Sequence, residues 1–490
     1  MHQLRVGLIL RLGVCLMTNY LDLSIVEIHD LLVKKKITPL DLVNESYARI
    51  EASDLNAFIT LDKEGAILRC MELGEVEESN LLFGIPIAIK DNIVTKGIIT
   101  TCGSKMLENF NPVYNASVID FVLDNKMIII GKTNMDEFAF GSTSETSYFG
   151  NSLNPWNKKL VPGGSSGGSA VSVAGSLVPF ALASDTGGSI RQPSAFCGVV
   201  GIKPTYGRVS RYGLVAFASS LDQIGCMSRN VYENALLLNV IARKDEKDLT
   251  SVSTSEDFTS LIGDSVSGMK MAIPSFYISD LIDKEIISRM DEVRFLLEKN
   301  NITIDVVDIP YIEHSVLLYQ IIGMGEASSN LARFDGIKYG YSYPDYKTLD
   351  ELYCKSRSLG FGDEVKRRIM VGSYILSGPN ARIYLEKAMR LRNSLALEFD
   401  KLFNDYDLII GPTTTTLPYE VGTFTDDPMK SFLDDVLTIP SNMAGLPSMS
   451  LPIGFSSNKL PIGMQIIGNK FDEKTIYKLA SFIEKELGGK

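Results

Sequence analysis

The spacing of hydrophobic positions changes along the chain, and the changes predict a series of helices and strands. Ser24-Ile25-Val26-Glu27 is a capping box, and apolar residues at helical spacing follow it to about Lys35. A second helix is expected from Thr38-Pro39 to about Ala52, with its apolar residues on one face. Short continuous apolar runs elsewhere are typical of buried strands. The chain is therefore expected to begin with two amphipathic helices and to continue with strands inside the protein.

Strands and helices are expected to alternate over most of the remaining chain. The predicted strands are residues 56–60, the run that ends at Lys90, and residues 126–130, 269–274, 302–309, 408–410, 449–452 and 464–467. The predicted helices are residues 62–73, a segment between residues 274 and 302, and residues 473–486. This alternation predicts an α/β fold, with a large mixed, mostly parallel sheet and helices on both of its faces.

The stretch that stands out is residues 161–204, which carries two glycine-rich serine clusters. The clusters are residues 163–169 and 187–189, and the apolar run between them is expected to form a buried helix followed by a buried strand. Glycines beside a serine let backbone N–H groups approach a ligand closely. Such N–H groups can bind an anion or the oxyanion of an acyl-transfer intermediate. The stretch therefore indicates two loops that lie side by side and carry serine chemistry.

A nucleophilic serine needs a base, and the sequence offers few histidines for that role. His2 lies in the N-terminal tail, His29 in an amphipathic helix, and His314 alone far down the chain. Residues 164–168 match G-x-S-x-G formally, but without a suitable histidine we reject a Ser-His-Asp triad. The other candidate is Lys90, at the end of an apolar strand. Burial would lower the pKa of its amine and make the neutral base available, although lysines at strand ends are more often solvated.

Composition narrows the class of protein. The chain has 490 residues, of which 45% are hydrophobic and 22% charged, and a formal net charge of −11. An acidic chain is a poor match for direct binding of a long phosphate backbone, so a partner is expected to make most contacts with any nucleic acid. The six cysteines are scattered without a C-x-x-C pair, which is typical of reduced thiols in the cytoplasm. The sequence contains no metal-ligand cluster and no run long enough to span a membrane, so we expect neither a metal nor a membrane contact.

Three motifs occur in an order and at a spacing that identify a family. They are GIPIAIKDNI around Lys90, PGGSSGGSA around Ser165, and DTGGSIRQPSAFCGVVGIKPTYGRVSRYG around Ser189. Together they resemble the amidase signature family, and the resemblance covers roughly residues 18–486. It implies a single amidase-signature domain at residues 17–490. Residues 1–16, which are basic and apolar, would be a start-site extension without a role or a targeting segment.

The resemblance also implies a role for each motif. Ser189 resembles the nucleophile that becomes acylated. Ser165 resembles the bridging serine, whose peptide bond with the preceding glycine is cis in this family. Lys90 resembles the base, so that neutral Lys90 would take a proton from Ser165 and Ser165 would take one from Ser189. The oxyanion would be bound by the backbone N–H groups of Thr186, Gly187, Gly188 and Ser189.

Two further motifs, IIIGKTNMDEFAFGS and GEASSNLARFDGIKYG, resemble the branch of the family that supplies ammonia to tRNA-dependent amidotransferases. The resemblance implies a glutaminase subunit in a heterotrimer with subunits B and C. A partner would hold misacylated Glu-tRNA(Gln) and amidate it with ATP for protein biosynthesis, and Asp-tRNA(Asn) stays open as a second acceptor. No cofactor is expected in this chain, whereas ATP and Mg are expected at the partner subunit. A cytoplasmic location is expected, or an organellar matrix if residues 1–16 are a targeting segment.

Glutamine recognition requires one group for the α-carboxylate and another for the α-ammonium. An arginine binds a carboxylate bidentately, and a carboxylate suits an ammonium group. By resemblance to the glutamine-using branch, we assign Arg368 and Asp435 to these roles and Tyr319 to the pocket wall. The adjacent Arg367 and Asp434 remain alternatives, as does a solvated helix face for both charge pairs.

The sequence departs from the family pattern at two places. Cys226 stands where the family usually has proline, and residues 378–384 differ from the usual sequence, which leaves the pocket rim and a partner surface in doubt.

Two other functions stay open. A free-standing amidase for small or aryl amides would use the same relay but would not need Arg368 and Asp435. A catalytically silent scaffold or tRNA-binding chain is disfavoured, because all the relay residues are present and the chain is acidic.

Overall fold

The computed structural model describes residues 19–253, 256–423 and 434–488, so the extension at residues 1–16 lies outside the described residues. The strands are β1 (Phe58–Leu61), β2 (Pro86–Lys90), β3 (Ile128–Thr133), β4 (Phe180–Asp185), β5 (Val200–Lys203), β6 (Gln223–Ser228), β7 (Lys270–Pro274), β8 (Thr303–Val307), β9 (Leu408–Pro412), β10 (Ser448–Phe455) and β11 (Pro461–Gly468). The helices are α1 (Ile25–Val33), α2 (Pro39–Glu51), α3 (Lys63–Glu72), α4 (Ser117–Asp124), α5 (Gly167–Ala174), α6 (Arg191–Cys197), α7 (Val231–Ile241), α8 (Lys284–Lys299), α9 (Ser315–Leu331), α10 (Leu349–Gly360), α11 (Asp363–Leu376), α12 (Glu386–Leu402), α13 (Ile439–Met443) and α14 (Glu473–Glu486).

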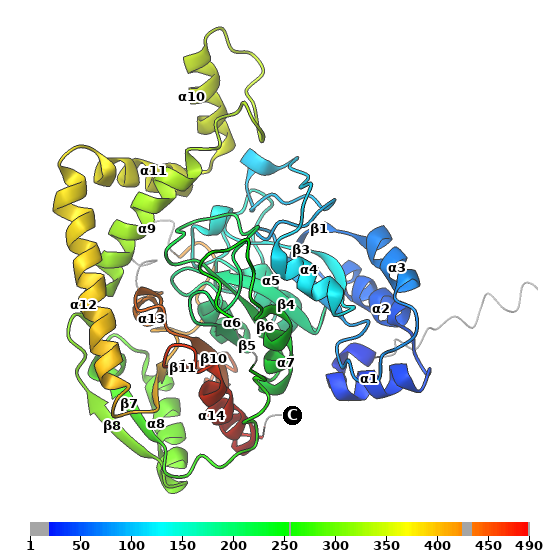
Figure 1. Cartoon of the computed structure of the whole chain (residues 1–490), viewed down its shortest axis with the longest axis vertical. Helices are drawn as coiled ribbons and strands as arrows, with labels where there is room; N and C mark the ends of the chain where they lie inside the picture. The colour runs from blue at the N-terminus through cyan, green and yellow to red at the C-terminus, as the bar shows by residue number, and fades with distance from the viewer. Residues whose placement is uncertain (1–18, 254–255, 424–433, 489–490) are drawn as a thin grey trace, which may run out of the picture.

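All these strands belong to one 11-stranded sheet, in the order β1-β3-β2-β4-β6-β5-β10-β11-β9-β7-β8 (Figure 1). Among the described strands, four neighbouring pairs are parallel and six are antiparallel. The prediction of a mixed α/β sheet is confirmed, but the expectation that it is mostly parallel is wrong. Two of the six antiparallel pairs, β5 with β6 and β10 with β11, arise because these strands are connected without a crossover helix, and a strand that returns directly beside its predecessor pairs antiparallel. The other four pair strands that are not consecutive in the chain.

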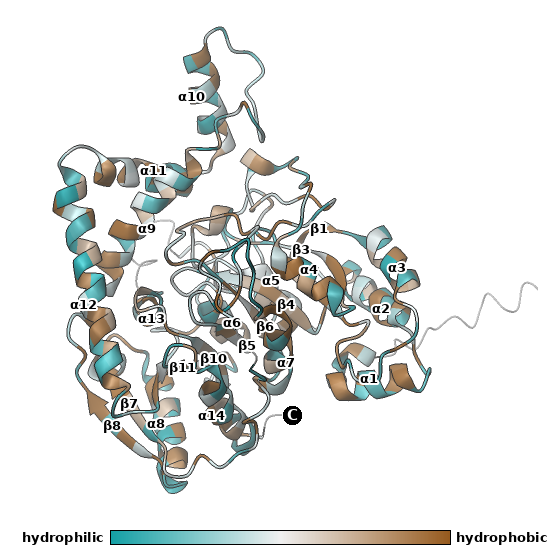
Figure 2. Ribbon diagram, in the orientation of Figure 1, coloured by the Kyte–Doolittle hydropathy of each residue, from teal (hydrophilic) through white to brown (hydrophobic). Residues whose placement is uncertain are grey.

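The strands β2, β3 and β4 bury both faces of the sheet, and their residues alternate between two apolar cores. In β4, Phe180 and Leu182 belong to the larger core, whereas Ala181 and Ala183 belong to the smaller one. Side chains of α4, α7 and α14 complete the larger core, and side chains of α2, α3 and α5 complete the smaller one. Helices therefore cover both faces, as predicted, and the outer helices keep their hydrophilic sides toward solvent (Figure 2). This double burial explains why the central strands appear in the sequence as continuous apolar runs.

Local sequence signals locate the helix ends well. Ser24 and Glu27 form the predicted capping box of α1, and Thr38 caps α2 in the same way. The predicted C-terminal helix coincides with α14, and the predicted buried helix and strand are α5 and β4. By contrast, β3 extends beyond its predicted end and includes Lys132, because the chain stays paired with β1 and β2 there.

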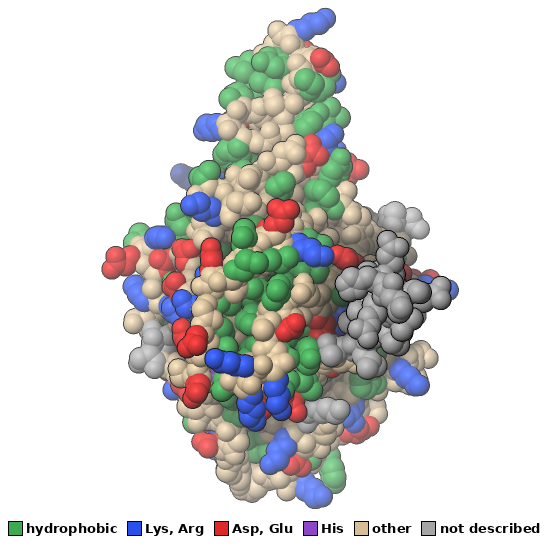
Figure 3. Space-filling model, turned by 90° about the vertical axis from the view of Figure 1, so that its right-hand side faces the viewer, with side chains coloured by type: hydrophobic (Ala, Val, Ile, Leu, Met, Phe, Trp, Pro, Cys, Tyr) green, Lys and Arg blue, Asp and Glu red, His purple; other side chains and the backbone are tan. Residues whose placement is uncertain are grey.

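Helices α9, α11 and α12 stand beside the sheet, and α10 projects beyond them (Figure 1). Apolar side chains of the projection are exposed, among them Tyr346, Leu349 and Leu359, and Figure 3 shows hydrophobic side chains on its surface. Within the described ranges, no helix is both long enough and apolar enough to cross a bilayer.

The two departures from the family pattern lie outside the relay. Cys226 is buried in β6, where its thiol lies 3.6 Å from the backbone oxygen of Asn234. Residues Ala381–Leu385 form a π-helical turn between α11 and α12, and none of them is buried. The first departure is accommodated in the core, and the second changes only the surface of the turn.

Candidate active site

The order of the strands brings the candidate base next to the first serine cluster. Because β2 and β4 are parallel neighbours, their carboxyl ends lie at the same edge of the sheet. Lys90 is the last residue of β2, and its Nζ lies 2.8 Å from Ser165 Oγ and 3.0 Å from Ser184 Oγ. Lys90 and Ser165 are both fully buried. The site therefore contains a buried amine between two hydroxyl groups.

The surroundings of Lys90 favour its neutral form. Burial lowers the pKa of the Lys90 amine to about 7, and the negative charges of Asp136, Asp185 and Asp222 oppose this shift without cancelling it. At neutral pH, much of the amine can therefore accept a proton. A hydroxyl both donates and accepts hydrogen bonds, so a proton on Ser165 Oγ has a direct path to the Lys90 amine.

The loop that carries Ser165 is held by close contacts with two other segments. The Gly164–Ser165 peptide bond is cis, as the family resemblance implied. The Gly164 N–H donates to Gln192 Oε1 at 2.8 Å, and the Asp136 N–H donates to Ser165 O at 3.2 Å. A Cβ atom at Gly164 would lie 2.1 Å from Asp136 Oδ2, so only glycine fits at this position.

The loop of the second cluster presents a row of backbone donors. Within the described residues, the N–H groups of residues 186–189 donate no hydrogen bond, whereas the next one, of Ile190, donates to Asp185 Oδ2 at 3.1 Å. Gly188 adopts a φ of 156°, and a Cβ atom there would lie 2.3 Å from Thr438 Oγ1. Adjacent unpaired N–H groups in a tight loop form a cradle for a negatively charged oxygen.

Ser189 is the most accessible of the three relay candidates. It is 6% exposed, whereas Lys90 and Ser165 are each 0% exposed. In the part of the chain that the structure describes, no hydrogen bond joins Ser189 to Ser165. The structure thus connects the first two relay candidates directly and does not connect the third.

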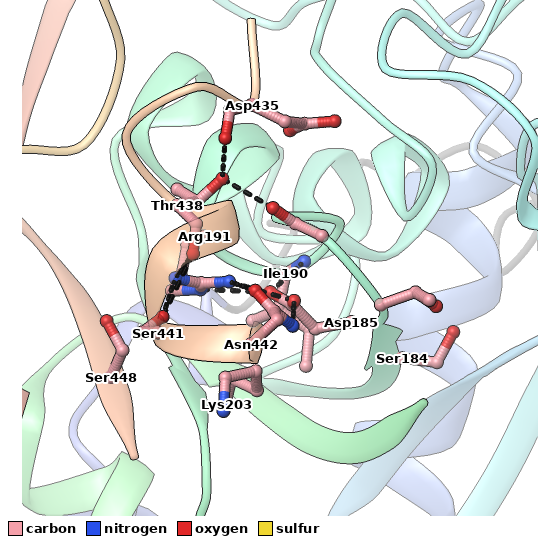
Figure 4. A network of polar contacts seen from close by, with 12 residues as sticks. Ser184, Asp185, Ile190, Arg191, Lys203, Asp435, Thr438, Ser441, Asn442 and Ser448 are labelled. Carbon is pink, nitrogen blue, oxygen red and sulfur yellow. Dashed lines mark hydrogen bonds and ion pairs between the residues drawn. The ribbon is translucent and has the colours of Figure 1, made fainter. Parts of the chain in front are cut away.

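Arg191 anchors the second loop from inside the protein (Figure 4). Its guanidinium group is fully buried and binds Asp185 Oδ1 at 2.9 Å and Asp185 Oδ2 at 3.0 Å. It also donates to Thr438 O, Ser441 Oγ, Asn442 Oδ1 and Gln465 Oε1. Burial raises the pKa of Asp185, but the charge and hydrogen bonds of Arg191 outweigh burial and lower this pKa to about 2. The buried ion pair between Asp185 and Arg191 therefore joins the two ends of the loop at residues 186–190.

A cavity of about 660 Å³ borders this loop, and Tyr319, Arg368 and Asp435 all line it. The ring of Tyr319 is 3.0 Å from the position of a Cβ atom at Gly187, and Asp435 Oδ1 is 2.4 Å from that of a Cβ atom at Gly188. The two glycines therefore let the cavity wall and the N–H groups approach each other closely. The wall of the cavity therefore contacts the loop that carries Ser189, although no residue of that loop lines the cavity itself.

The structure separates the two neighbouring arginines that the sequence left open. The side chain of Arg368 is 9% exposed, and that of Arg367 is 46% exposed. The guanidinium carbon of Arg368 lies 5.2 Å from the ring centre of Phe140 and 5.8 Å from that of Phe217. Both arginines pair with Glu364 and line the cavity, but Arg368 is the more deeply buried and packs against the edge-to-face ring pair of Phe140 and Phe217.

The two neighbouring aspartates differ in the same way. The carboxylate of Asp434 accepts hydrogen bonds from Ser142 Oγ at 3.0 Å and from Tyr419 OH at 2.6 Å. Asp435 Oδ1 is buried and has no hydrogen-bond partner among the described residues. Burial, together with the charges of Asp434 and Asp185, holds the pKa of Asp435 well above its usual range. An unpaired carboxylate oxygen at the wall of a cavity is suited to a cationic ligand group.

Several residues that hold the site were missed by the sequence analysis. Asp185 and Arg191 flank the second cluster, and this flanking was a usable signal, since buried charges need partners. Asp136 lies in a motif that was recognised without a role for this residue. Ser184 gave no signal, because its contact with Lys90 exists only through the pairing of β2 with β4.

The arrangement provides the groups that nucleophilic acyl transfer requires. A buried amine can act as base, a hydroxyl lies beside it, and a row of N–H groups can bind an oxyanion. The cavity adds the guanidinium group of Arg368 and the buried carboxyl group of Asp435. Among the described residues, no group of three or more His, Cys, Asp or Glu side chains could hold a metal ion.

Comparison with known proteins assigns the class. A family model described as Amidase matches residues 41–477. The chain belongs to the amidase family, and it is an enzyme of that family. The resemblance that the motifs indicated is thereby confirmed.

The chain is similar in particular to proteins named as the A subunit of glutamyl-tRNA(Gln) amidotransferase. The one from Pediococcus pentosaceus is 52% identical over 471 residues, which cover 95% of this chain and 97% of the relative. The one from Listeria innocua is 50% identical over 470 residues, with the same coverage of both chains. The crystal structure of the Thermotoga maritima protein of this name matches with a TM-score of 0.78 at 41% identity, over 96% of this chain and 94% of that one.

Proposed function

We propose that this enzyme hydrolyses glutamine through Lys90, Ser165 and Ser189 and supplies the ammonia to a tRNA-dependent amidotransferase. The contact that carries the proposal is the one between the fully buried Lys90 amine and Ser165 Oγ, at 2.8 Å. The names of the relatives give the assembly in which the ammonia would be used.

The reaction has two halves that use the same groups. Neutral Lys90 takes the proton of Ser165, Ser165 takes the proton of Ser189, and Ser189 Oγ attacks the side-chain amide carbon of glutamine. The developing oxyanion is bound by the N–H groups of residues 186–189. The proton returns through Ser165 to the nitrogen, ammonia leaves, and a glutamyl ester remains on Ser189. Water then attacks the ester by the same relay, and glutamate is released.

The side chains that line the cavity explain why the substrate is glutamine. Arg368 binds the α-carboxylate of glutamine, because its guanidinium group is held at the wall against the rings of Phe140 and Phe217. Asp435 binds the α-ammonium group with its unpaired Oδ1. Tyr319 lines the wall between them and the oxyanion loop. A simple amide would use the relay but neither of the two charged groups.

The relatives are named as subunits, so the enzyme is proposed to work with other subunits of an amidotransferase. We propose a heterotrimer with subunits B and C, in which a partner binds ATP, Mg and the misacylated Glu-tRNA(Gln). The formal net charge of −11 supports a tRNA site on the partner rather than on this chain. We place the reaction in the cytoplasm.

The test is ammonia release from glutamine by the chain isolated with its natural partners, with charged tRNA and ATP added or withheld. We expect release that rises with both additions and that Ser189→Ala abolishes, a loss of more than ~10⁴-fold for a nucleophile in a relay. Release that survives in Ser189→Ala would overturn the relay. Turnover of simple amides but not of glutamine would favour a free-standing amidase.

A matched pair of variants tests the substrate pocket. Arg368→Ala is expected to raise KM for glutamine by about tenfold or more, because it removes a bidentate partner of the α-carboxylate. Arg367→Ala, one position away at the half-exposed rim of the same cavity, is expected to leave KM within about twofold. If Arg367→Ala raised KM as much as Arg368→Ala, the assignment of the α-carboxylate to Arg368 alone would be wrong.

A further inference from the structure

Glu137 lies between the relay and the helix that carries Arg368, and the proposed reaction gives it no role. It belongs to the short helical turn η3 (Glu137–Ala139), inside the motif IIIGKTNMDEFAFGS. The next two residues, Phe138 and Ala139, have φ angles of 51° and 65°. Non-glycine residues rarely adopt positive φ, and such strain is concentrated where a structure fixes a functional geometry. The turn therefore holds its side chains at a conformational cost.

The carboxylate of Glu137 caps a helix to which it does not belong. It accepts the N–H of Gly362 at 2.9 Å on Oε2 and at 3.2 Å on Oε1. Gly362 is the N-cap residue of α11 and has no side chain with which to cap the helix itself. Ser104 Oγ donates to the same carboxylate at 2.5 Å and fixes its position. Glu137 is 3% exposed, so water does not replace these contacts.

The first turn of α11 determines where Arg368 lies. Glu364, in that turn, accepts a hydrogen bond from Arg368 Nε at 2.6 Å. Phe140, three residues after Glu137 in sequence, packs against the guanidinium group, whose carbon lies 5.2 Å from the ring centre. On the side of the relay, the N–H of Asp136 donates to Ser165 O at 3.2 Å. One short segment thus contacts both the helix that positions the arginine and the loop that carries the bridging serine.

We propose that Glu137 is a positioning residue, which fixes the first turn of α11 through the Gly362 N–H and so sets the place of Arg368 for the α-carboxylate of the substrate. This inference rests on the proposed glutamine hydrolysis. Glu137 lines the same cavity, but its carboxylate is turned to Ser104 and Gly362, and no hydrogen bond joins it to a relay residue in the described part of the chain. Its effect is therefore on the binding of the substrate and not on the chemical step.

The first experiment measures glutamine kinetics of Glu137→Ala and Glu137→Gln in the complex with the natural partners. Glu137→Ala is expected to raise KM by about tenfold while kcat stays within about threefold, because it loosens a binding contact made equally in the ground and transition states. Glu137→Gln keeps one carbonyl oxygen for the Gly362 N–H and is expected to recover most of the loss. Unchanged KM in Glu137→Ala, or equal losses of kcat in both variants, would overturn the proposal.

The matched control is Glu45→Ala. Glu45 is also a buried glutamate that accepts backbone N–H groups, those of Tyr20 at 3.0 Å and Leu21 at 3.3 Å, but it belongs to α2. Its loss is expected to lower stability and leave KM unchanged. A rise of KM in Glu45→Ala as large as that in Glu137→Ala would mean that general destabilisation causes both.

A second measurement does not depend on the substrate. Hydrogen exchange of the amides at residues 362–366 is expected to become about tenfold faster in Glu137→Ala than in the unaltered chain, because the cap of α11 is lost. If the unaltered complex released no ammonia from glutamine, the proposed function would fail, and the exchange data would still decide whether Glu137 holds α11. Unchanged exchange at these amides would refute the positioning role by itself.

Discussion

Lys90 and Lys203 end two strands of the same sheet, and their surroundings differ in one decisive respect. Both side chains are buried, and burial lowers the pKa of each amine to about 7, with the charge of Arg191 adding to the shift at Lys203. Lys90 Nζ contacts the hydroxyl groups of Ser165 and Ser184. Lys203 Nζ donates to two backbone carbonyls, of Leu446 at 2.5 Å and of Pro204 at 3.2 Å.

The difference teaches that burial alone does not make a lysine a base. A carbonyl oxygen carries no proton to give, so Lys203 can only donate to its partners. A hydroxyl group can give up a proton, so Lys90 can act on Ser165. Lys203 instead ties the end of β5 to the segment before β10, because the Leu446 carbonyl precedes that strand. Lys90 is therefore suited to proton transfer, whereas Lys203 stabilises the sheet.

The largest expected effect is that of Lys90→Met, which fills the same space without an amine. We expect kcat for glutamine to fall by about 10²–10⁴-fold, the usual contribution of a general base. Ammonia release and thermal unfolding of the same preparation check this. If the variant folds and keeps more than a tenth of the activity, Lys90 is not the base of the relay and does not differ from Lys203 in function.

The next effect is on pH dependence. Lys90 must be neutral to accept a proton, so activity is present above the pKa of about 7 and is lost as the pH falls through it, by about tenfold per pH unit. The pH profile of kcat/KM checks the position of this limb. Asp434 is a necessary control, because burial raises its pKa to about 7 as well. The acidic limb of the profile should persist in Asp434→Asn. If it disappears in this variant, the limb reports the titration of Asp434 and not of Lys90.

The smallest effect on activity is expected for Lys203→Met. It leaves the Leu446 and Pro204 carbonyls without their donor, so the free energy of unfolding should fall by roughly 1–3 kcal/mol. Because Lys203 touches no relay residue, kcat should stay within about threefold. Denaturant unfolding and glutamine kinetics measure the two quantities. A hundredfold loss of kcat with unchanged stability would mean that Lys203 serves the reaction as well as Lys90.

The sequence by itself determined the local elements and the identity of the relay candidates. The capping box of α1 needs only contacts between residues three apart, and such signals are readable without the fold. The apolar runs gave the buried strands because both faces of the sheet are covered. Lys90, Ser165 and Ser189 were found because each lies in a long motif of distinctive composition.

The tertiary structure alone decided which of these residues meet. Lys90 and Ser165 are 75 positions apart, and Arg191 reaches Gln465 across 274 positions. The antiparallel majority of the sheet, the contact of Ser184 and the packing of Arg368 on Phe217 all depend on such distant pairings. Local propensity carries no information about them, because free energy from burial and hydrogen bonding at these sites arises only when the whole sheet has formed.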